Sequence, residues 1–147
     1  MNEIMNHPES FFLENFNVDR IFNTIEKTDY LFLYYIRICG KQNGSDGRAY
    51  LSDLSGAMNI EIPALSRQIE KLQGKGYVSW QTDHAAGKTY VELTSKAVEL
   101  MAEERARMAN AYEKILGEIG PEEIERTVQT MRKITRILNI PDVPEGE

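Results

Sequence analysis

Residues 50–94 contain a fixed order of short helical and strand-like segments, and this order constrains the fold more than any other feature. The segments are a short helix from Ser52, a turn at 58–60, a second helix from Pro63 to about Gly74, and strands at 77–82 and 89–93. A proline in the first turn and a glycine after the last turn are common helix boundaries. Two short helices joined by a tight turn and followed by a hairpin predict a winged helix-turn-helix module.

The segments on either side are expected to be mainly helical. Apolar residues in 18–25 recur at helical spacing, and residues 30–39 are apolar at every position except Arg37. Local propensity there favours a strand. We nevertheless predict a buried helix with Thr28 as its N-cap, since no neighbouring strands offer a sheet. Residues 48–50 are expected to add a short third strand to the wing.

The C-terminal part is expected to consist of two more helices. Thr94 should cap a long helix that is broken at Gly117 and Gly120, and Pro121 should begin the last helix. That last helix carries apolar residues along one face, from Ile124 to Leu138.

The predicted fold class is therefore mostly α with a small β wing, in one domain. Its parts are N-terminal buried and dimerisation helices at 1–40, the winged helix-turn-helix lobe at 48–94, C-terminal dimerisation helices at 95–140, and a tail at 141–147. The terminal helices are more apolar than a small winged module can cover. A homodimer is the simplest solution, and its two-fold symmetry suits a pseudo-palindromic DNA site.

Composition excludes several classes of protein. The chain has 147 residues, of which 41% are hydrophobic and 27% charged, as in globular proteins. No apolar stretch is long enough to cross a bilayer, and a single cysteine fits a reducing cytoplasm. We find no metal-ligand spacing, nucleophile motif or glycine-rich phosphate loop, and so expect neither an enzyme nor a cofactor.

The net charge of −6 is unusual for a nucleic-acid binder, but the acidity lies outside the predicted module. Between Lys41 and Glu92 there are six basic and six acidic residues, so this stretch is neutral. A neutral module binds DNA only if its cations gather on one face, and its non-specific affinity should be modest.

Four stretches carry a resemblance to a known family: residues 51–54 (LSDL), 65–72 (LSRQIEKL), 75–78 (KGYV) and 91–94 (VELT). In this order and spacing, over roughly residues 20–138, the chain resembles the MarR family, the multiple-antibiotic-resistance type of bacterial transcription regulator. The resemblance implies an α-rich dimer with winged DNA-binding lobes, often a repressor that a small aromatic ligand releases from DNA. Three departures stand out: Ala85 and Gly87 replace the acidic residue and arginine of the wing, Glu61 replaces a small hydroxyl cap, and Ala97 replaces a glycine.

The second helix supplies most candidate DNA contacts, since Leu65, Ile69 and Leu72 should point inward. The candidates are Ser52, Pro63, Ala64, Ser66, Arg67, Gln68, Lys71 and, on the wing, Lys88. Arg67 suits guanine or a phosphate and Gln68 suits adenine, whereas Ser66 and Lys71 suit phosphates. The same residue types also occur on ordinary solvated helix faces.

Two further hypotheses concern residues 30–39. Tyr30, Tyr34 and Arg37 are candidates to line a pocket for a small aromatic effector, although an aromatic-rich helix is more often plain core. Cys39 is either a buried thiol or a redox-sensing one; few cations stand near it in the sequence to activate it.

The sequence thus predicts a cytoplasmic, sequence-specific double-stranded DNA-binding transcriptional regulator, a ligand-responsive repressor acting as a homodimer. The alternative is a winged-helix protein–protein interaction module with weak or lost DNA binding. The neutral module and the missing wing arginine favour that alternative.

Overall fold

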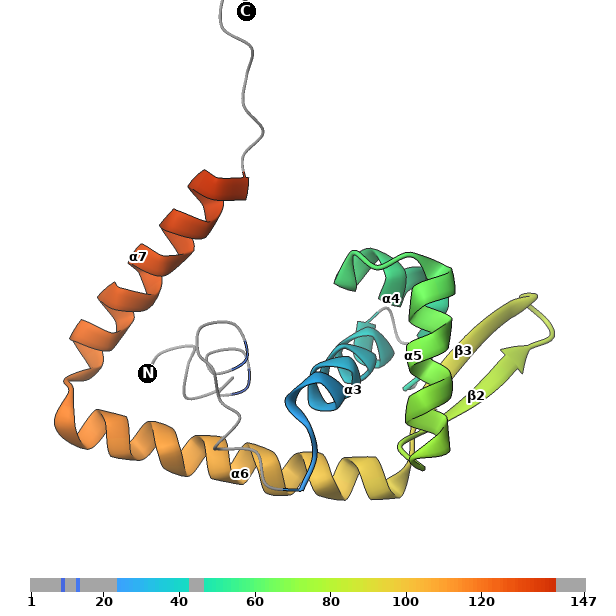
Figure 1. The fold of residues 1–147 in the computed structure, drawn as a ribbon, viewed down its shortest axis with the longest axis horizontal. Helices are drawn as coiled ribbons and strands as arrows, with labels where there is room; N and C mark the ends of the chain where they lie inside the picture. The colour runs from blue at the N-terminus through green and yellow to red at the C-terminus, as the bar shows by residue number, and fades with distance from the viewer. Residues whose placement is uncertain (1–8, 10–12, 14–23, 43–46, 140–147) are drawn as a thin grey trace, which may run out of the picture. The chain divides into compact units, whose positions relative to one another are not determined.

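The computed structural model describes residues 9, 13, 24–42 and 47–139. Their elements, labelled as in Figure 1, are α3 (Lys27–Lys41), β1 (Ala49–Tyr50), α4 (Leu51–Met58), α5 (Ile62–Gly74), β2 (Val78–Asp83), β3 (Lys88–Leu93), α6 (Ser95–Glu118) and α7 (Pro121–Asn139). The described part is therefore mostly helical with one small sheet, as the sequence predicts.

The chain divides into two compact units, which are described separately. One is Val18–Arg107, and the other combines Met1–Asn17 with Met108–Glu147. The first unit contains the whole predicted winged module together with α3 and the first half of α6. The second contains the rest of α6 and α7.

The Val18–Arg107 unit is built around a three-stranded antiparallel sheet of order β1-β3-β2. Its core side chains are at most 2% exposed and come from every surrounding helix: Tyr30, Leu33, Ile36, Leu54, Leu65, Ile69, Leu72, Val91, Ala97 and Met101. The predicted third strand is confirmed, because Ala49 pairs with Val91 and Tyr50 with Tyr90.

Residues 30–39 form the buried helix that we expected despite their strand-like composition. Within α3, Tyr30, Leu33 and Ile36 are almost fully buried, so tertiary packing overrides local propensity. The predicted cap is wrong: the N-cap is Glu26, without a side-chain cap bond, and Thr28 lies inside the helix. Most of the predicted helix at 18–25, and most of the N-terminal region before it, fall outside the described residues.

The turn between α4 and α5 has the residues its geometry requires. Asn59 adopts a left-handed conformation with φ 55°, which asparagine tolerates better than most residues. The Ser55 hydroxyl donates a 2.6 Å hydrogen bond to the Ile60 carbonyl, and the Ile60 N–H donates back to the Ser55 carbonyl. These bonds hold the two helices of the helix-turn-helix in a defined relation.

The end of α5, the start of the wing and the start of α6 meet at one junction. Gly76 takes φ 80°, and the Tyr77 N–H donates to the Leu72 carbonyl as the chain leaves the helix. The Thr94 hydroxyl donates to the Gly76 carbonyl at 2.6 Å and accepts the Ala97 N–H at 3.2 Å. Thr94 therefore caps α6, as predicted, and also ties that helix to the end of α5.

An ion pair joins α5 to the start of α3. Lys75 Nζ lies 2.6 Å from Asp29 Oδ2, and the carboxylate side chain is only 12% exposed. The Lys96 ammonium donates to the Lys75 carbonyl at 2.9 Å. Lys75, directly after α5, is thus tied to both α3 and α6.

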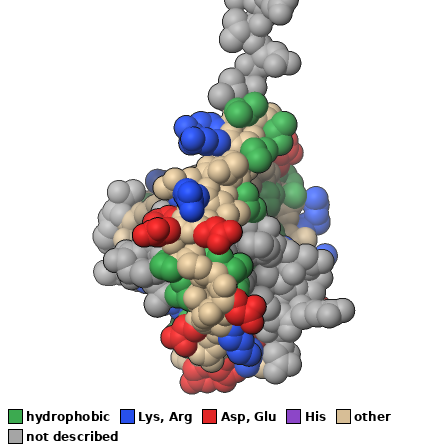
Figure 2. All heavy atoms as spheres, turned by 90° about the vertical axis from the view of Figure 1, so that its left-hand side faces the viewer, with side chains coloured by type: hydrophobic (Ala, Val, Ile, Leu, Met, Phe, Trp, Pro, Cys, Tyr) green, Lys and Arg blue, Asp and Glu red, His purple; other side chains and the backbone are tan. Residues whose placement is uncertain are grey.

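In the second unit, Pro121 begins α7 as predicted, but α6 does not break at Gly117. The helix continues through this residue to Glu118. In α7, Ile124 and Val128 are buried, whereas Ile134, Ile137 and Leu138 are 52%, 70% and 77% exposed. Figure 2 shows hydrophobic side chains gathered toward the C-terminal end of this helix. None of the described helices has the length and apolarity to cross a membrane.

Candidate nucleic-acid interface

Helix α5 has one apolar face that is fixed against the core and an opposite face that reaches solvent. Leu65, Ile69 and Leu72 are at most 1% exposed. Because residues four apart share a helix face, Pro63, Arg67 and Lys71 form an outward row, and all three are exposed. Figure 1 shows α5 beside the β2–β3 hairpin.

The remaining candidates differ in how accessible they are. Ala64, Ser66 and Gln68 are half-buried, so Gln68 lies nearer the edge of the outward face than the sequence analysis assumed. Ser52 is exposed in the first turn of α4. The structure thus brings Pro63, Arg67 and Lys71 together in one exposed row.

Two acidic residues share the solvent-exposed surface of α5. Glu61 is the N-cap residue, as expected, but its side chain makes no cap hydrogen bond. Glu70 is exposed beside Lys71. These carboxylates lower the positive potential that Arg67 and Lys71 offer to a polyanion.

The wing is a regular hairpin that is slightly longer than predicted. The predicted strands shift to Val78–Asp83 and Lys88–Leu93, with Asp83 paired to Lys88 across the last rung. The Ala86 N–H donates to Asp83 Oδ1 at 3.1 Å, which closes the tip. Lys88 is exposed, as a DNA contact requires.

Arg48, which is not among the candidates predicted from the sequence, belongs to the same cluster as Lys88. Arg48 Cζ lies 4.9 Å from the centre of the Tyr90 ring, and Lys88 Nζ lies 5.6 Å from that of Tyr50. The two tyrosines are register partners, and their rings meet edge to face at 5.8 Å. The sequence contains a signal for this cluster, because Arg48-Ala49-Tyr50 and Lys88-Thr89-Tyr90 both place a cation two residues before a tyrosine.

Asp83 organises this cluster electrostatically. The Tyr50 hydroxyl donates to Asp83 Oδ2 at 3.2 Å, and Arg48 Nη1 lies 3.6 Å from the same oxygen. The backbone N–H of Ala86, and after it the Tyr50 hydroxyl and Arg48, hold the pKa of the Asp83 carboxyl below its usual range. Tyr50 is the main influence that raises the pKa of Arg48. Both groups are therefore ionised at neutral pH.

The predicted effector residues occupy different environments. Tyr30 is fully buried in the core, and Arg37 Cζ lies 5.5 Å from the centre of the half-buried Tyr34 ring. Arg37 also lines a hollow of about 240 Å³. Its other described lining residues are Ile36, Gly40, Lys41, Gly47, Glu92, Leu93 and Val98.

Cys39 is buried at 4% exposure on α3. Burial, and secondarily the Asp53 charge, raises the pKa of its thiol, and a raised pKa disfavours the reactive thiolate. His84 is exposed in the wing loop, as expected. In residues 9, 13, 24–42 and 47–139, no three His, Cys, Asp or Glu side chains lie close enough to hold a metal ion.

A helix-turn-helix followed by an antiparallel wing, carried on long flanking helices, defines a winged-helix fold of the MarR type. The structures it resembles are consistently MarR-family winged-helix transcription regulators. No protein-family model matches the sequence.

Three solved structures illustrate the likeness. A cysteine-to-serine mutant of MarR from E. coli, complexed with operator DNA, aligns with a TM-score of 0.61 and 16% identity over 79% of this chain and 84% of that one. A MepR–DNA complex from S. aureus gives 0.60 and 17% over 78% and 79%. A MarR family protein from Bacillus stearothermophilus gives 0.59 and 15% over 82% and 81%.

Proposed function

We propose that this chain is a sequence-specific double-stranded DNA-binding transcriptional regulator that acts as a homodimer. The observation that carries the proposal is the outward row of α5, where Arg67 and Lys71 are exposed directly opposite a buried apolar face. A helix anchored in this way can enter a major groove with its cations toward the bases and phosphates. Two of the similar structures hold DNA, which supports the same use of this fold.

The residues divide by the kind of contact they would make. Arg67 has the planar fork that pairs with guanine or clamps a phosphate, and Gln68 suits adenine. Ser52, Ser66, Lys71 and Lys88 suit phosphates, which set position without carrying sequence information. Pro63 and Ala64 would bring the start of α5 close to the duplex.

A protein–protein interaction module is the second candidate, because Glu61 and Glu70 partly offset the cations of α5. The two functions differ in their dependence on DNA sequence and salt. DNA binding should be measured by fluorescence anisotropy on the duplex upstream of the gene and on a scrambled duplex, between 50 and 200 mM salt.

For a regulator, the upstream duplex binds more tightly than the scrambled one, and both weaken with salt. Arg67→Ala should cost about 1–3 kcal/mol on the specific duplex if the arginine reads a base, and Lys71→Ala should weaken both duplexes alike. Arg126→Ala is the matched control, since Arg126 is exposed on α7. Equal and feeble binding of wild type to both duplexes would favour the interaction module.

The homodimer is proposed from the apolar end of α7. Ile134, Ile137 and Leu138 are each more than half exposed, and a second copy is the simplest cover for such a face. Two-fold symmetry would also present two copies of α5 to successive major grooves.

Ile137→Glu should shift the protein from dimer to monomer in sedimentation velocity. Asn139→Glu places the same residue at an exposed position two residues further on, on the other side of α7, and should leave the dimer intact. A dimer that survives Ile137→Glu would mean that this face lies outside the interface.

A response to a small aromatic anion, and with it repression relieved by that ligand, is proposed for the hollow lined by Arg37. Arg37 and Lys41 supply positive charge, and Ile36, Leu93 and Val98 supply apolar walls. Among the predicted effector residues Arg37 would bind the carboxylate, and Tyr34 would hold the guanidinium through its ring. Tyr30, fully buried, would act only as part of the floor.

Benzoate titrated into the protein tests the site by calorimetry. Heat of binding that Arg37→Gln abolishes would support it, whereas equal heats for wild type and variant would exclude this hollow.

A further inference from the structure

We propose that Arg48 and Lys88 form a paired phosphate-binding site on the wing, the ligand being the backbone of duplex DNA. The inference rests on the proposed function and extends it to Arg48, the residue directly before the edge strand β1. In this proposal the wing contacts DNA through one face of its sheet, and not through the loop at residues 84–87.

Both cations belong to one face of the sheet. Side chains alternate along a strand, so Lys88 shares a face with Tyr90. Arg48, just before β1, lies on the same face because its guanidinium is 4.9 Å from the centre of the Tyr90 ring. Tyr50 and Tyr90 are register partners and lie side by side. The opposite face carries Ala49 and Val91, both fully buried. One face therefore packs on the core, while the other holds the cations beside Tyr90, which is itself only 5% exposed.

The side chains of the two cations cross over the tyrosine pair. Arg48, just before β1, lies over Tyr90 of β3, and Lys88 of β3 lies over Tyr50 of β1. The Tyr90 hydroxyl donates to Gln81 Oε1 at 3.0 Å, which extends the ordered row to β2. Long side chains held on aromatic rings lose less rotamer freedom when they bind a ligand.

Both cations are also accessible to a ligand. Arg48 retains 44% of its side-chain exposure while it contacts Tyr90 and Asp83, and Lys88 is exposed. The heads of both side chains can therefore reach a ligand without any rearrangement of the core. A guanidinium fork and an ammonium are the two groups that proteins use most for phosphates.

Asp83 sets the charge of the site. Its carboxylate is shared by the Tyr50 hydroxyl, the Ala86 N–H and Arg48, so Arg48, Lys88 and Asp83 together carry one net positive charge. The carboxylate orients Arg48 and also competes with a phosphate for it. Glu92, on the same face as Tyr90, lines the hollow with Arg37 and Lys41.

A duplex phosphate is favoured over an acidic protein because the same unit carries Arg67 and Lys71 on α5. A phosphate contact on the wing would add to the contacts of Arg67 and Lys71 with the same DNA duplex. It would contribute affinity and little sequence preference, since phosphates carry no base identity.

The test is the salt dependence of DNA binding by wild type, Arg48→Gln, Lys88→Gln and the double variant, with circular dichroism as the check on folding. Each phosphate contact contributes about 0.9 to the slope of log K against log salt. Each single variant should therefore lower the slope by about 0.9. Its affinity deficit relative to wild type should shrink about 3.5-fold between 50 and 200 mM salt, equally on specific and scrambled duplexes.

Three matched variants sharpen the result. Arg48→Lys keeps the charge and should retain the wild-type slope, whereas Arg126→Gln, on α7, should change nothing. Asp83→Asn keeps an acceptor for the Ala86 N–H, removes the competing charge, and should tighten binding several-fold.

Unchanged slopes in Arg48→Gln and Lys88→Gln, with Arg67→Ala still defective, would overturn the paired site and leave the proposed function standing. A wild type that binds no duplex would overturn both. Loss of binding to an acidic peptide in the same variants, without any effect on DNA, would assign the surface to a protein partner instead.

Discussion

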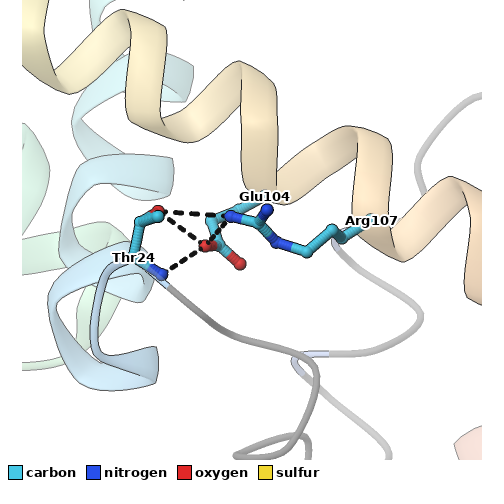
Figure 3. A network of polar contacts seen from close by, with 3 residues as sticks. All are labelled: Thr24, Glu104 and Arg107. Atoms are coloured by element: carbon cyan, nitrogen blue, oxygen red, sulfur yellow. Dashed lines mark hydrogen bonds and ion pairs between the residues drawn. The ribbon is translucent and has the colours of Figure 1, made fainter.

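The Thr24 hydroxyl donates a 2.7 Å hydrogen bond to Glu104 Oε1, although the two residues are 80 positions apart. The Thr24 N–H donates to the same oxygen at 2.9 Å, and Arg107 Nη2 at 2.5 Å (Figure 3). Glu104 itself is fully buried on α6. One carboxylate oxygen therefore fastens the segment before α3 to α6, within the unit that carries the wing.

Replacing Glu104 should test how far this network stabilises the fold. Glu104→Ala leaves three donors without that acceptor, and should lower the free energy of unfolding by about 1–3 kcal/mol. Glu104→Gln keeps an acceptor oxygen and should cost less. Urea denaturation followed by circular dichroism measures the free energy of unfolding of both variants. An equal loss in the two would show that the hydrogen bonds to Oε1 do not account for the stabilisation.

Thr94 should be sensitive to the loss of its hydroxyl. Thr94→Ala removes both the cap on α6 and the bond to the Gly76 carbonyl, and should cost about 0.5–2 kcal/mol of stability. Thr94→Ser retains the hydroxyl and is the control. Equal urea midpoints for the two variants would argue against the cap.

Two helical glycines should respond to alanine in opposite directions. A Cβ at Gly40 would lie 2.9 Å from backbone atoms of Gly47, so Gly40→Ala should destabilise the fold by about 1–3 kcal/mol. A Cβ at Gly56 meets nothing within 4 Å, and Gly56→Ala should stabilise α4 by about 0.5–1 kcal/mol. Thermal melts compare them; destabilisation by Gly56→Ala would contradict the reasoning.

The wing should lose stability in acid through Asp83. Its folded-state pKa lies below the ordinary value of 3.8, so the charged carboxylate stabilises the fold above that pH and stops doing so as the pH falls through the folded value. The melting temperature of wild type should exceed that of Asp83→Asn at pH 7, and the difference between the two melting temperatures should shrink below about pH 3.8. A difference that grows on acidification would be inconsistent with this sign.

Cys39 should react slowly in the native protein. It is 4% exposed, and burial raises the pKa of its thiol. Dithionitrobenzoate at pH 8 should modify it far more slowly than in denaturant. Rapid native-state modification, or peroxide release of wild type but not Cys39→Ala from DNA, would support redox sensing instead.

Hydrophobic spacing and turn residues were enough to predict the order of the winged module. Leu65, Ile69 and Leu72 recur at helical spacing, Pro63 lies in the first turn of their helix, Gly74 ends it, and Thr94 caps α6. These are local signals, each decided by residues within a few positions. The helical state of residues 30–39 was also predicted, but from the absence of partner strands and against local propensity.

What local signals could not supply is which distant side chains meet. Thr28 looks like a cap in sequence, yet the helix begins before it, at Lys27. Gly117 looks like a break, yet a glycine within a long helix costs only about 1 kcal/mol, and α6 continues through it.

The sequence by itself determined the order of the elements and the exposed row of α5, because both follow from periodicity along the chain. Only the tertiary structure decided that Arg48 lies over Tyr90 and Lys88 over Tyr50. The same holds for the hydrogen bond from Thr24 to Glu104. Those contacts depend on strand register and on the packing of elements that are far apart in the sequence, and neither is encoded by any short stretch of residues.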